Sequence, residues 1–300
     1  MIWASGWRLA SAVSNAGGLG IIGSGSMYPD VLKEHVQKCK AATSKPFAVN
    51  IPMLYPAVEE HIATVIAEKV PIVFTSAGNP ATWTAKLKEA GITVVHVVAS
   101  VKFALKAEAA GADAVVAEGF EAGGHNGREE TTTMVLVPLV RDAVRIPVIA
   151  AGGIADGRSM LAAMALGADG VQMGSRFVCS VEASSHPAFK QHVVESREGD
   201  TLLTLKELAP VRMMRNPFFE EVRQAYANCA SVDQLKALLG RARAKRGMFQ
   251  GDLEQGELEI GQVAAGLNDI LPAGEIVRRV MAEFVGAQNQ VAGWDIGRGI

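Results

Sequence analysis

The chain has 300 residues, of which 49% are hydrophobic and 20% are charged, and it contains 31 glycines. This composition is typical of a folded domain and excludes a disordered chain. The 29 basic and 31 acidic residues are evenly mixed and give a net charge of −2, so neither nucleic acid nor an anionic membrane is an expected partner. Three widely spaced cysteines exclude a disulfide framework and fit a reducing cytoplasm. Neither a signal peptide nor an apolar run of membrane-spanning length is present to direct the chain elsewhere.

Seven short apolar segments recur along the first part of the chain, and each is apolar at both odd and even positions. They are residues 19–25, 47–51, 72–78, 93–99, 114–119, 147–153 and 170–176. A strand with this pattern is buried on both faces, as parallel strands covered by helices are. Helical periodicity occupies the intervals, for example at residues 57–69, 80–89, 100–110 and 156–166. The sequence therefore predicts repeated strand–helix units in a parallel sheet.

Such a repeat builds either an open doubly wound sheet or a closed (β/α)8 barrel. Polar or small residues end most of the strands, including Asn50, Ser76 and Glu118. Functional groups at many strand ends, rather than at one switch point, favour the barrel. We therefore predict an α/β fold, a (β/α)8 TIM barrel over residues 1–196. Only seven strands are found and the chain opens on a helical pattern, so the first strand of the barrel is expected to be missing from this chain.

The pattern changes after residue 196, where helices without strands are expected. Residues 218–228, 232–244 and 276–285 are amphipathic and are separated by glycine-rich turns. We predict that residues 197–300 form a small helical region beside the barrel mouth, with the C-terminal helix packing back on the barrel.

Gly18, Gly20 and Gly23 match the spacing of a dinucleotide-binding loop, but their setting is wrong for one. That loop follows a strand and opens a helix, whereas these glycines close a helix and lead into a strand. A helix C-cap at Gly17 and Gly18 is the preferred interpretation.

The segment of residues 147–177 contains two neighbouring strands that each end in a small-residue turn, Gly152–Gly153 and Gly174–Ser175. In a barrel these are the last two strands, whose loops commonly bind phosphate through exposed backbone N–H groups and a short helix N-terminus. The Ser175 hydroxyl would add a donor. The alternative is that the glycines only make tight turns, but two such turns on adjacent strands favour a phosphate site.

A glycine-rich loop at residues 121–127 follows the strand that ends in Glu118, and it contains His125. A histidine at the carboxyl end of barrel strands points into the common active-site volume and titrates near neutral pH, so His125 is the candidate catalytic residue. Asn50 offers a donor and an acceptor at another strand end, which suits a heterocycle edge as well as a turn cap. No zinc-peptidase, serine-hydrolase or P-loop motif occurs, and no metal site is expected.

With these residues in place, the chain resembles the FMN-dependent enoyl-acyl-carrier-protein reductase II (FabK) family, within the wider group that includes the nitronate monooxygenases (2-nitropropane dioxygenases). The resemblance covers nearly the whole chain and is most specific at GFEAGGHNG (residues 119–127), AAGGIADGR (150–158) and QMGSRF (172–177). Family members begin with a further strand that ends in Gly-Gly-Met, and this sequence starts at that methionine.

The resemblance implies a barrel that holds FMN, with the phosphate and the flavin ring bound by residues spread over several strand ends. These are Met1, Asn50, Glu118, Gly123, Ala151, Gly152, Gly153, Gly174 and Ser175. It implies that His125 is a base toward nitronates or shapes the pocket of a reductase. The reductase activity would use NADH or NADPH to reduce an enoyl thioester of acyl carrier protein in fatty acid biosynthesis.

The continuation HNGREETTT and the stretch GELEIGQ are more similar to the reductases than to the nitronate oxidases. The alternatives are a nitronate monooxygenase that acts on a small nitronate with O2, and a phosphate-binding barrel without redox chemistry. The latter lacks a lysine or paired carboxylates at strand ends. A homodimer in the cytoplasm is expected.

Overall fold

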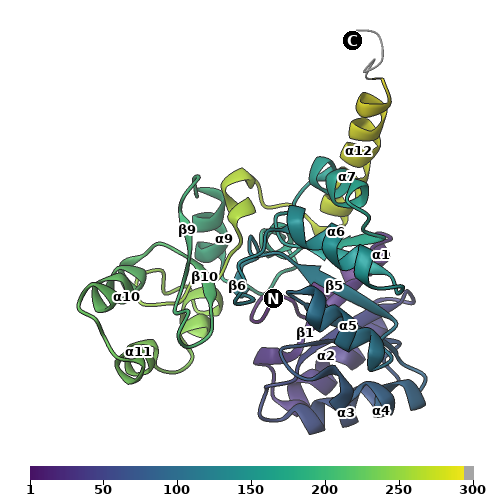
Figure 1. Ribbon diagram of the computed structural model, residues 1–300, viewed down its shortest axis with the longest axis horizontal. Coiled ribbons are helices and arrows are strands. Elements are labelled where there is room, and N and C mark those ends of the chain that lie inside the picture. The colour runs from purple at the N-terminus through teal and green to yellow at the C-terminus, as the bar shows by residue number, and fades with distance from the viewer. Residues whose placement is uncertain (294–300) are drawn as a thin grey trace.

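The computed structural model describes residues 1–293, and its larger lobe is a curled sheet of seven parallel strands surrounded by helices (Figure 1). The strands, in their order in the sheet, are β1 (Gly20–Gly23), β2 (Phe47–Pro52), β3 (Ile72–Ser76), β4 (Thr93–Val98), β5 (Ala114–Glu118), β7 (Val148–Ala151) and β8 (Gly170–Gln172). This arrangement confirms the seven predicted strands and the α/β class.

A helix follows each of these strands and returns the chain to the amino end of the sheet, as parallel pairing requires. These helices are α2 (Pro29–Ala42), α3 (Val58–Ala67), α4 (Thr84–Glu89), α5 (Val101–Ala109), α6 (Thr133–Ala143) and α7 (Gly157–Ala165), with short α8 (Ser175–Val178) after β8. Two 3-10 turns, η1 (Ser24–Ser26) and η2 (Pro80–Thr82), lie in the connections.

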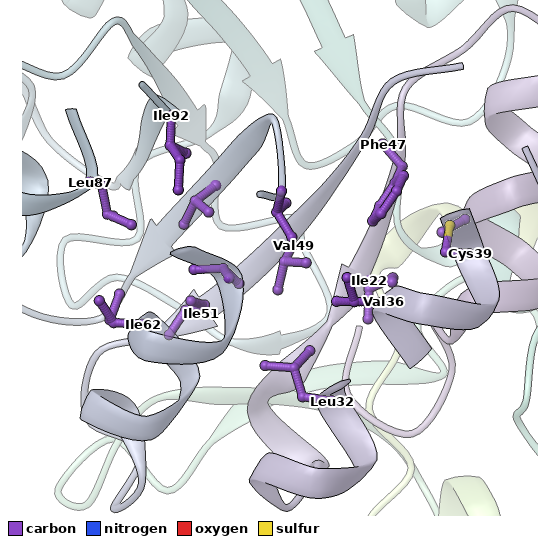
Figure 2. Packing of buried hydrophobic residues seen from close by; sticks show 14 of the residues in the cluster. Ile22, Leu32, Val36, Cys39, Phe47, Val49, Ile51, Ile62, Leu87 and Ile92 are labelled. Carbon is purple, nitrogen blue, oxygen red and sulfur yellow. The ribbon is translucent and has the colours of Figure 1, made fainter. Parts of the chain in front are cut away.

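The strands are apolar at both odd and even positions because each face of the sheet packs against its own core. Inward-pointing side chains fill the curled sheet, among them Ala48, Phe74, Val95, Val116 and Ala151. Outward-pointing side chains pack under the helices, and Figure 2 shows Ile22 of β1 beside Val36 of α2 and Ile51 of β2 beside Ile62 of α3.

The first and last strands of the sheet, β1 and β8, do not pair with each other within residues 1–293. The first residues of the chain lie at this side, at the carboxyl end of the strands. The Gly23 N–H donates to the Ser5 carbonyl at 2.9 Å, and Met1 Cγ lies 3.7 Å from the position that a Cβ on Gly174 would take. Met1 is therefore placed between the ends of β1 and β8.

The helix α1 (Trp7–Asn15) ends at the glycines that matched the dinucleotide-loop spacing. Gly17 has φ +96°, its N–H donates to the Ser14 carbonyl, and the Gly18 N–H donates to the Val13 carbonyl. This is a Schellman C-cap, in which glycine takes the left-handed conformation. The C-cap interpretation is confirmed.

The smaller lobe, on the left of Figure 1, contains an antiparallel sheet of three short strands as well as helices. Its elements are β6 (Gly124–His125), β9 (Thr201–Thr204), β10 (Val211–Met214), α10 (Pro217–Ala227), α11 (Val232–Leu239) and the π-helical turn η3 (Lys245–Phe249). The prediction that no strand follows residue 196 was wrong, because β10 pairs with β6 from the distant glycine-rich loop and with β9. The predicted helix at 232–244 ends at Leu239, since Gly240 has φ +63°.

The remaining helices connect the two lobes or cover the barrel. They are α9 (Pro187–Val194), the 3-10 turn η4 (Gln262–Gly266) and α12 (Ala273–Ala292). α12 packs against α7 and α1. Within residues 1–293, none of the helices combines the length and the hydrophobicity that crossing a bilayer requires.

Candidate active site

A cavity opens at the carboxyl end of the parallel strands, between the barrel and the smaller lobe. Eight of the nine residues expected to bind a cofactor line it, and they come from the ends of β5, β7 and β8, the glycine-rich loop and the start of the chain: Met1, Glu118, Gly123, Ala151, Gly152, Gly153, Gly174 and Ser175. The structure thus brings together residues that are far apart in the sequence, as the carboxyl face of a barrel does.

Two turns of this cavity leave backbone N–H groups without partners. Gly152 and Gly153 have φ +90° and φ +69°, conformations that residues with a Cβ rarely adopt. None of the described residues accepts a hydrogen bond from the N–H of Gly152, Gly153 or Gly174. Bare N–H groups in turns of this kind form a concavity suited to an anion, and Ser175 directly follows Gly174 in the chain.

A capping box starts the helix that follows the Gly152–Gly153 turn. The Asp156 carboxylate accepts a hydrogen bond from Ser159 N at 2.8 Å, and Ser159 Oγ accepts one from Asp156 N at 3.1 Å. This reciprocal pairing satisfies the first N–H groups of α7. It therefore holds the glycine turn in a defined position at the end of β7.

The glycine-rich loop is held against β7 by Thr133, the first residue of α6. The Thr133 N–H donates to the Glu121 carboxylate at 2.9 Å, and Thr133 Oγ lies 2.9 Å from both Glu121 Oε2 and the Gly152 carbonyl oxygen. A Cβ on Gly152 would lie only 2.7 Å from the Gly119 carbonyl oxygen. The close approach of these two loops therefore requires glycine at position 152.

Buried Arg212 of β10 fixes the same loop from the smaller lobe. Its guanidinium donates two hydrogen bonds to the Phe120 carbonyl, at 3.1 and 3.0 Å, and lies over the Phe120 ring. Burial lowers the pKa of Arg212, and the nearby Glu121 opposes this effect. The smaller lobe thus positions the loop that forms one wall of the cavity.

A segment from the C-terminal part of the chain covers the cavity, and sequence reasoning did not place it there. The Gly261 N–H donates to Ser175 Oγ at 2.9 Å, the Gln262 N–H donates to the Glu121 carbonyl at 3.0 Å, and a Cβ on Gly123 would collide with Ile260. The lining residues that were not predicted are Ile2, Ala4, Glu121, Ala122, Ile154, Gln172, Val178, Met248, Glu259, Ile260 and Val263. The sequence signal for this segment is the GELEIGQ stretch, which contains the lining residues Glu259 and Ile260.

Three carboxyl groups in and beside the cavity, Glu118, Glu257 and Glu259, have raised pKa values. Burial raises the pKa of Glu118 to about 7. Burial also raises the pKa of Glu259, against the opposing charge of His125, while burial and the Glu259 carboxylate raise the pKa of Glu257 to about 8. Burial therefore favours the protonated form of these carboxyl groups.

Two of the predicted site residues lie outside the lining of this cavity. His125 is exposed and pairs with Val211 in the small sheet, and its charge acts on the cavity residue Glu259. Asn50 lies on β2, where its carbonyl oxygen accepts a hydrogen bond from Ser24 Oγ at 2.8 Å. Their functional roles stay predictions. Within residues 1–293, no cluster of three or more His, Cys, Asp or Glu side chains could hold a metal ion.

The cavity fits the phosphate end of a flavin nucleotide. The unpaired N–H groups at Gly152, Gly153 and Gly174 supply donors, and a Cβ on Gly174 would meet only Met1, at 3.7 Å, so an incoming group can approach the backbone there. Phosphate oxygens accept several N–H hydrogen bonds at once. The donors present at these turns are therefore compatible with the phosphate of FMN.

Comparison with known proteins agrees with this site. The family model described as nitronate monooxygenase matches residues 1–65 and 56–283. The structure of FabK from Thermotoga maritima superimposes with a TM-score of 0.93 and 45% identity, covering 98% of this chain and 93% of that one. A nitroalkane oxidase structure from Streptomyces ansochromogenes gives a TM-score of 0.82 and 29% identity, covering 97% and 95%.

A curated relative from Mycobacterium tuberculosis is 32% identical, over 95% of this chain and 91% of its own length. It is a (3aS,4S,5R,7aS)-5-hydroxy-7a-methyl-1-oxo-octahydro-1H-indene-4-carboxyl-CoA dehydrogenase. The family of this chain is thus shown by a match along most of its length. The protein belongs to the FabK and nitronate monooxygenase family and is an oxidoreductase of this FMN-dependent group.

Proposed function

We propose that this protein reduces the carbon–carbon double bond of trans-2-enoyl thioesters, including those of acyl carrier protein in fatty acid synthesis, at the expense of NADH or NADPH. One observation carries the proposal. The chain shares 45% identity with the FabK structure but 29% with the nitroalkane oxidase structure, over nearly the same share of its length. The named activity of the curated relative, a carboxyl-CoA dehydrogenase, also favours a thioester substrate.

The residues of the chain divide into those that hold the cofactor and those that shape the space beside it. Gly152, Gly153, Gly174 and Ser175 would hold the FMN phosphate, while Met1, Gly123 and Glu118 would lie beside its ring. Bound FMN supplies the hydride chemistry, which no side chain supplies. Ile260 and its neighbours exclude water from the site, which strengthens hydrogen bonds to the substrate.

Reduction of an enoyl thioester adds a hydride to the β-carbon and a proton to the α-carbon, and negative charge develops on the thioester oxygen. Glu118 retains a proton on its carboxyl near neutral pH because burial raises its pKa to about 7. A neutral carboxyl group is a hydrogen-bond donor. Glu118 therefore offers a donor at the cavity wall where charge would develop.

The second candidate function is the oxidation of alkyl nitronates with O2, with His125 as the base. The family model that matches most of the chain is described as nitronate monooxygenase, and this match favours it.

A paired assay separates the two functions. FMN-loaded protein is given crotonyl-N-acetylcysteamine with NADH or NADPH in one arm and propionate-3-nitronate with O2 in the other. We expect nicotinamide oxidation in the first arm and slow oxygen uptake in the second. Oxygen uptake without any enoyl reduction would refute the proposal. The variant His125→Ala tests the role of the histidine: loss of nitronate oxidation alone assigns the histidine to that reaction, whereas loss of both reactions indicates a residue that shapes the pocket.

A further inference from the structure

A cluster of two aromatic rings and one cation lies beside the cavity and has no role in the site described above. The rings of Trp3 and Phe249 are 5.6 Å apart, and Lys245 Nζ lies 5.5 Å from the centre of the Trp3 ring. Trp3 stands between the lining residues Ile2 and Ala4, and Phe249 directly follows the lining residue Met248. The cluster therefore flanks the lining residues along the chain, and Phe249 leaves 43% of its surface exposed.

The backbone on both sides of this cluster is unusual. Trp3 has φ +59°, which is unfavourable for a bulky residue. Lys245 to Phe249 form a π-helical turn, a conformation that is rare and occurs frequently at functional sites. Packing around Met248 and Ile260 holds both segments in these conformations. Strain that is maintained in this way is a pointer to function.

Lys245 contacts the Trp3 ring but pairs with no carboxylate of the described residues. Arg246 is paired with Asp252 at 2.7 Å. The Arg243 guanidinium donates to the carbonyls of residues 238, 239 and 255. Among the residues described, no carboxylate lies within 4.0 Å of Lys245 Nζ. Its charge is therefore available to an anion from outside the protein.

We propose that Trp3, Lys245 and Phe249 bind the phosphopantetheine arm of the thioester substrate, with Lys245 at its phosphate. This inference rests on the proposed enoyl reduction. The arm is a chain of methylene and amide groups that bears the thioester at one end and a phosphate at the other. Aromatic faces suit the chain, and an ammonium group suits the phosphate. The same arm occurs in coenzyme A and in acyl carrier protein, so the subsite serves either source.

The test compares substrates that contain or lack the arm. For Lys245→Gln we expect KM for crotonyl-CoA to rise about tenfold, as expected for the loss of one partly exposed charge-assisted hydrogen bond. The kcat value and the KM for crotonyl-N-acetylcysteamine, which lacks the phosphate, stay unchanged. Lys245→Arg restores the KM for crotonyl-CoA. The matched control is Lys45→Gln, because Lys45 is exposed before β2 at the opposite end of the strands.

Two further measurements distinguish a failure of the proposed enoyl reduction from a failure of the proposed subsite. Turnover of crotonyl-N-acetylcysteamine tests the proposed reduction without the subsite. Calorimetry with 4′-phosphopantetheine and with pantetheine tests the subsite without turnover, and we expect the phosphate to strengthen binding in the parent protein but not in Lys245→Gln. Equal affinity for the two compounds in the parent would overturn the proposal. A KM effect with crotonyl-CoA but none with crotonyl-acyl carrier protein would also overturn it, since the anion recognised would then be one that only coenzyme A carries.

Discussion

Replacement of Gly153 by alanine separates the strain of the glycine turn from its role in holding the cofactor. Gly153 has φ +69°, and an added Cβ would lie 3.6 to 3.7 Å from the side-chain carbons of Glu121, at ordinary contact distance. The substitution therefore creates no collision. Its cost is conformational, about 1–2 kcal/mol for an L-residue in the left-handed region, which a domain of ordinary stability tolerates.

The strain is relieved if the peptide rotates, and rotation turns the N–H of residue 153 away from the cavity. A hydrogen bond to a charged phosphate contributes about 1.5–3 kcal/mol. Its loss weakens FMN binding by about 10-fold to 100-fold. We therefore expect Gly153→Ala to lower the stability of the apoprotein slightly and its FMN affinity strongly.

Gly91 provides the matched control. It has φ +75°, no atom lies within 4 Å of an added Cβ, and it precedes β4 at the amino end of the sheet. Gly91→Ala should cost the same free energy of unfolding and leave FMN affinity unchanged. Urea denaturation of the apoproteins and titration of FMN fluorescence measure the two quantities. The reasoning is refuted if Gly153→Ala binds FMN as tightly as the parent, or if Gly91→Ala weakens binding equally.

Three further predictions concern side chains around the cavity. Glu118 keeps its proton in the folded apoprotein up to about pH 7, whereas the unfolded chain releases it near 4.5, so the free energy of unfolding should fall by at most about 3 kcal/mol as the pH rises through this window. Glu118→Gln should flatten that dependence in urea melts, and an unchanged slope would contradict the assignment. Asp156→Ala removes the cap of α7 and should cost about 1 kcal/mol, seen as a lower Tm; an unaltered Tm would argue against the capping role. Arg212→Leu leaves the Phe120 carbonyl without its donors and should cost about 3 kcal/mol, with weaker FMN binding. Full FMN affinity in that variant would show that the smaller lobe does not position the loop.

Much of the barrel could be predicted from the sequence because its signals are local. The double-sided apolar pattern of segments such as residues 114–119 follows directly from burial between helices and barrel interior. The glycine turn at Gly152 was found because only glycine suits its backbone and its contact with Gly119. The carboxyl ends of parallel strands share one edge, so residues at several strand ends could be assigned to one site.

The smaller lobe was not predictable in the same way. β10 has four residues and includes the charged Arg212, and it is a strand because it pairs with β6 and β9. Glu259 and Ile260 reach the cavity because Met213 of β10 forms a bridge with Glu259. A short strand is stabilised by its partners, and no pattern within four residues identifies partners that are distant in the chain.

The sequence by itself determined the strand–helix repeat and the glycine turns at the ends of the strands, since each depends on residues that are neighbours along the chain. The tertiary structure alone decided which segment covers the cavity, where His125 and Asn50 lie relative to it, and which lysine beside it lacks a carboxylate partner. Those outcomes depend on the packing of segments far apart in sequence, where desolvation and long-range pairing determine the geometry.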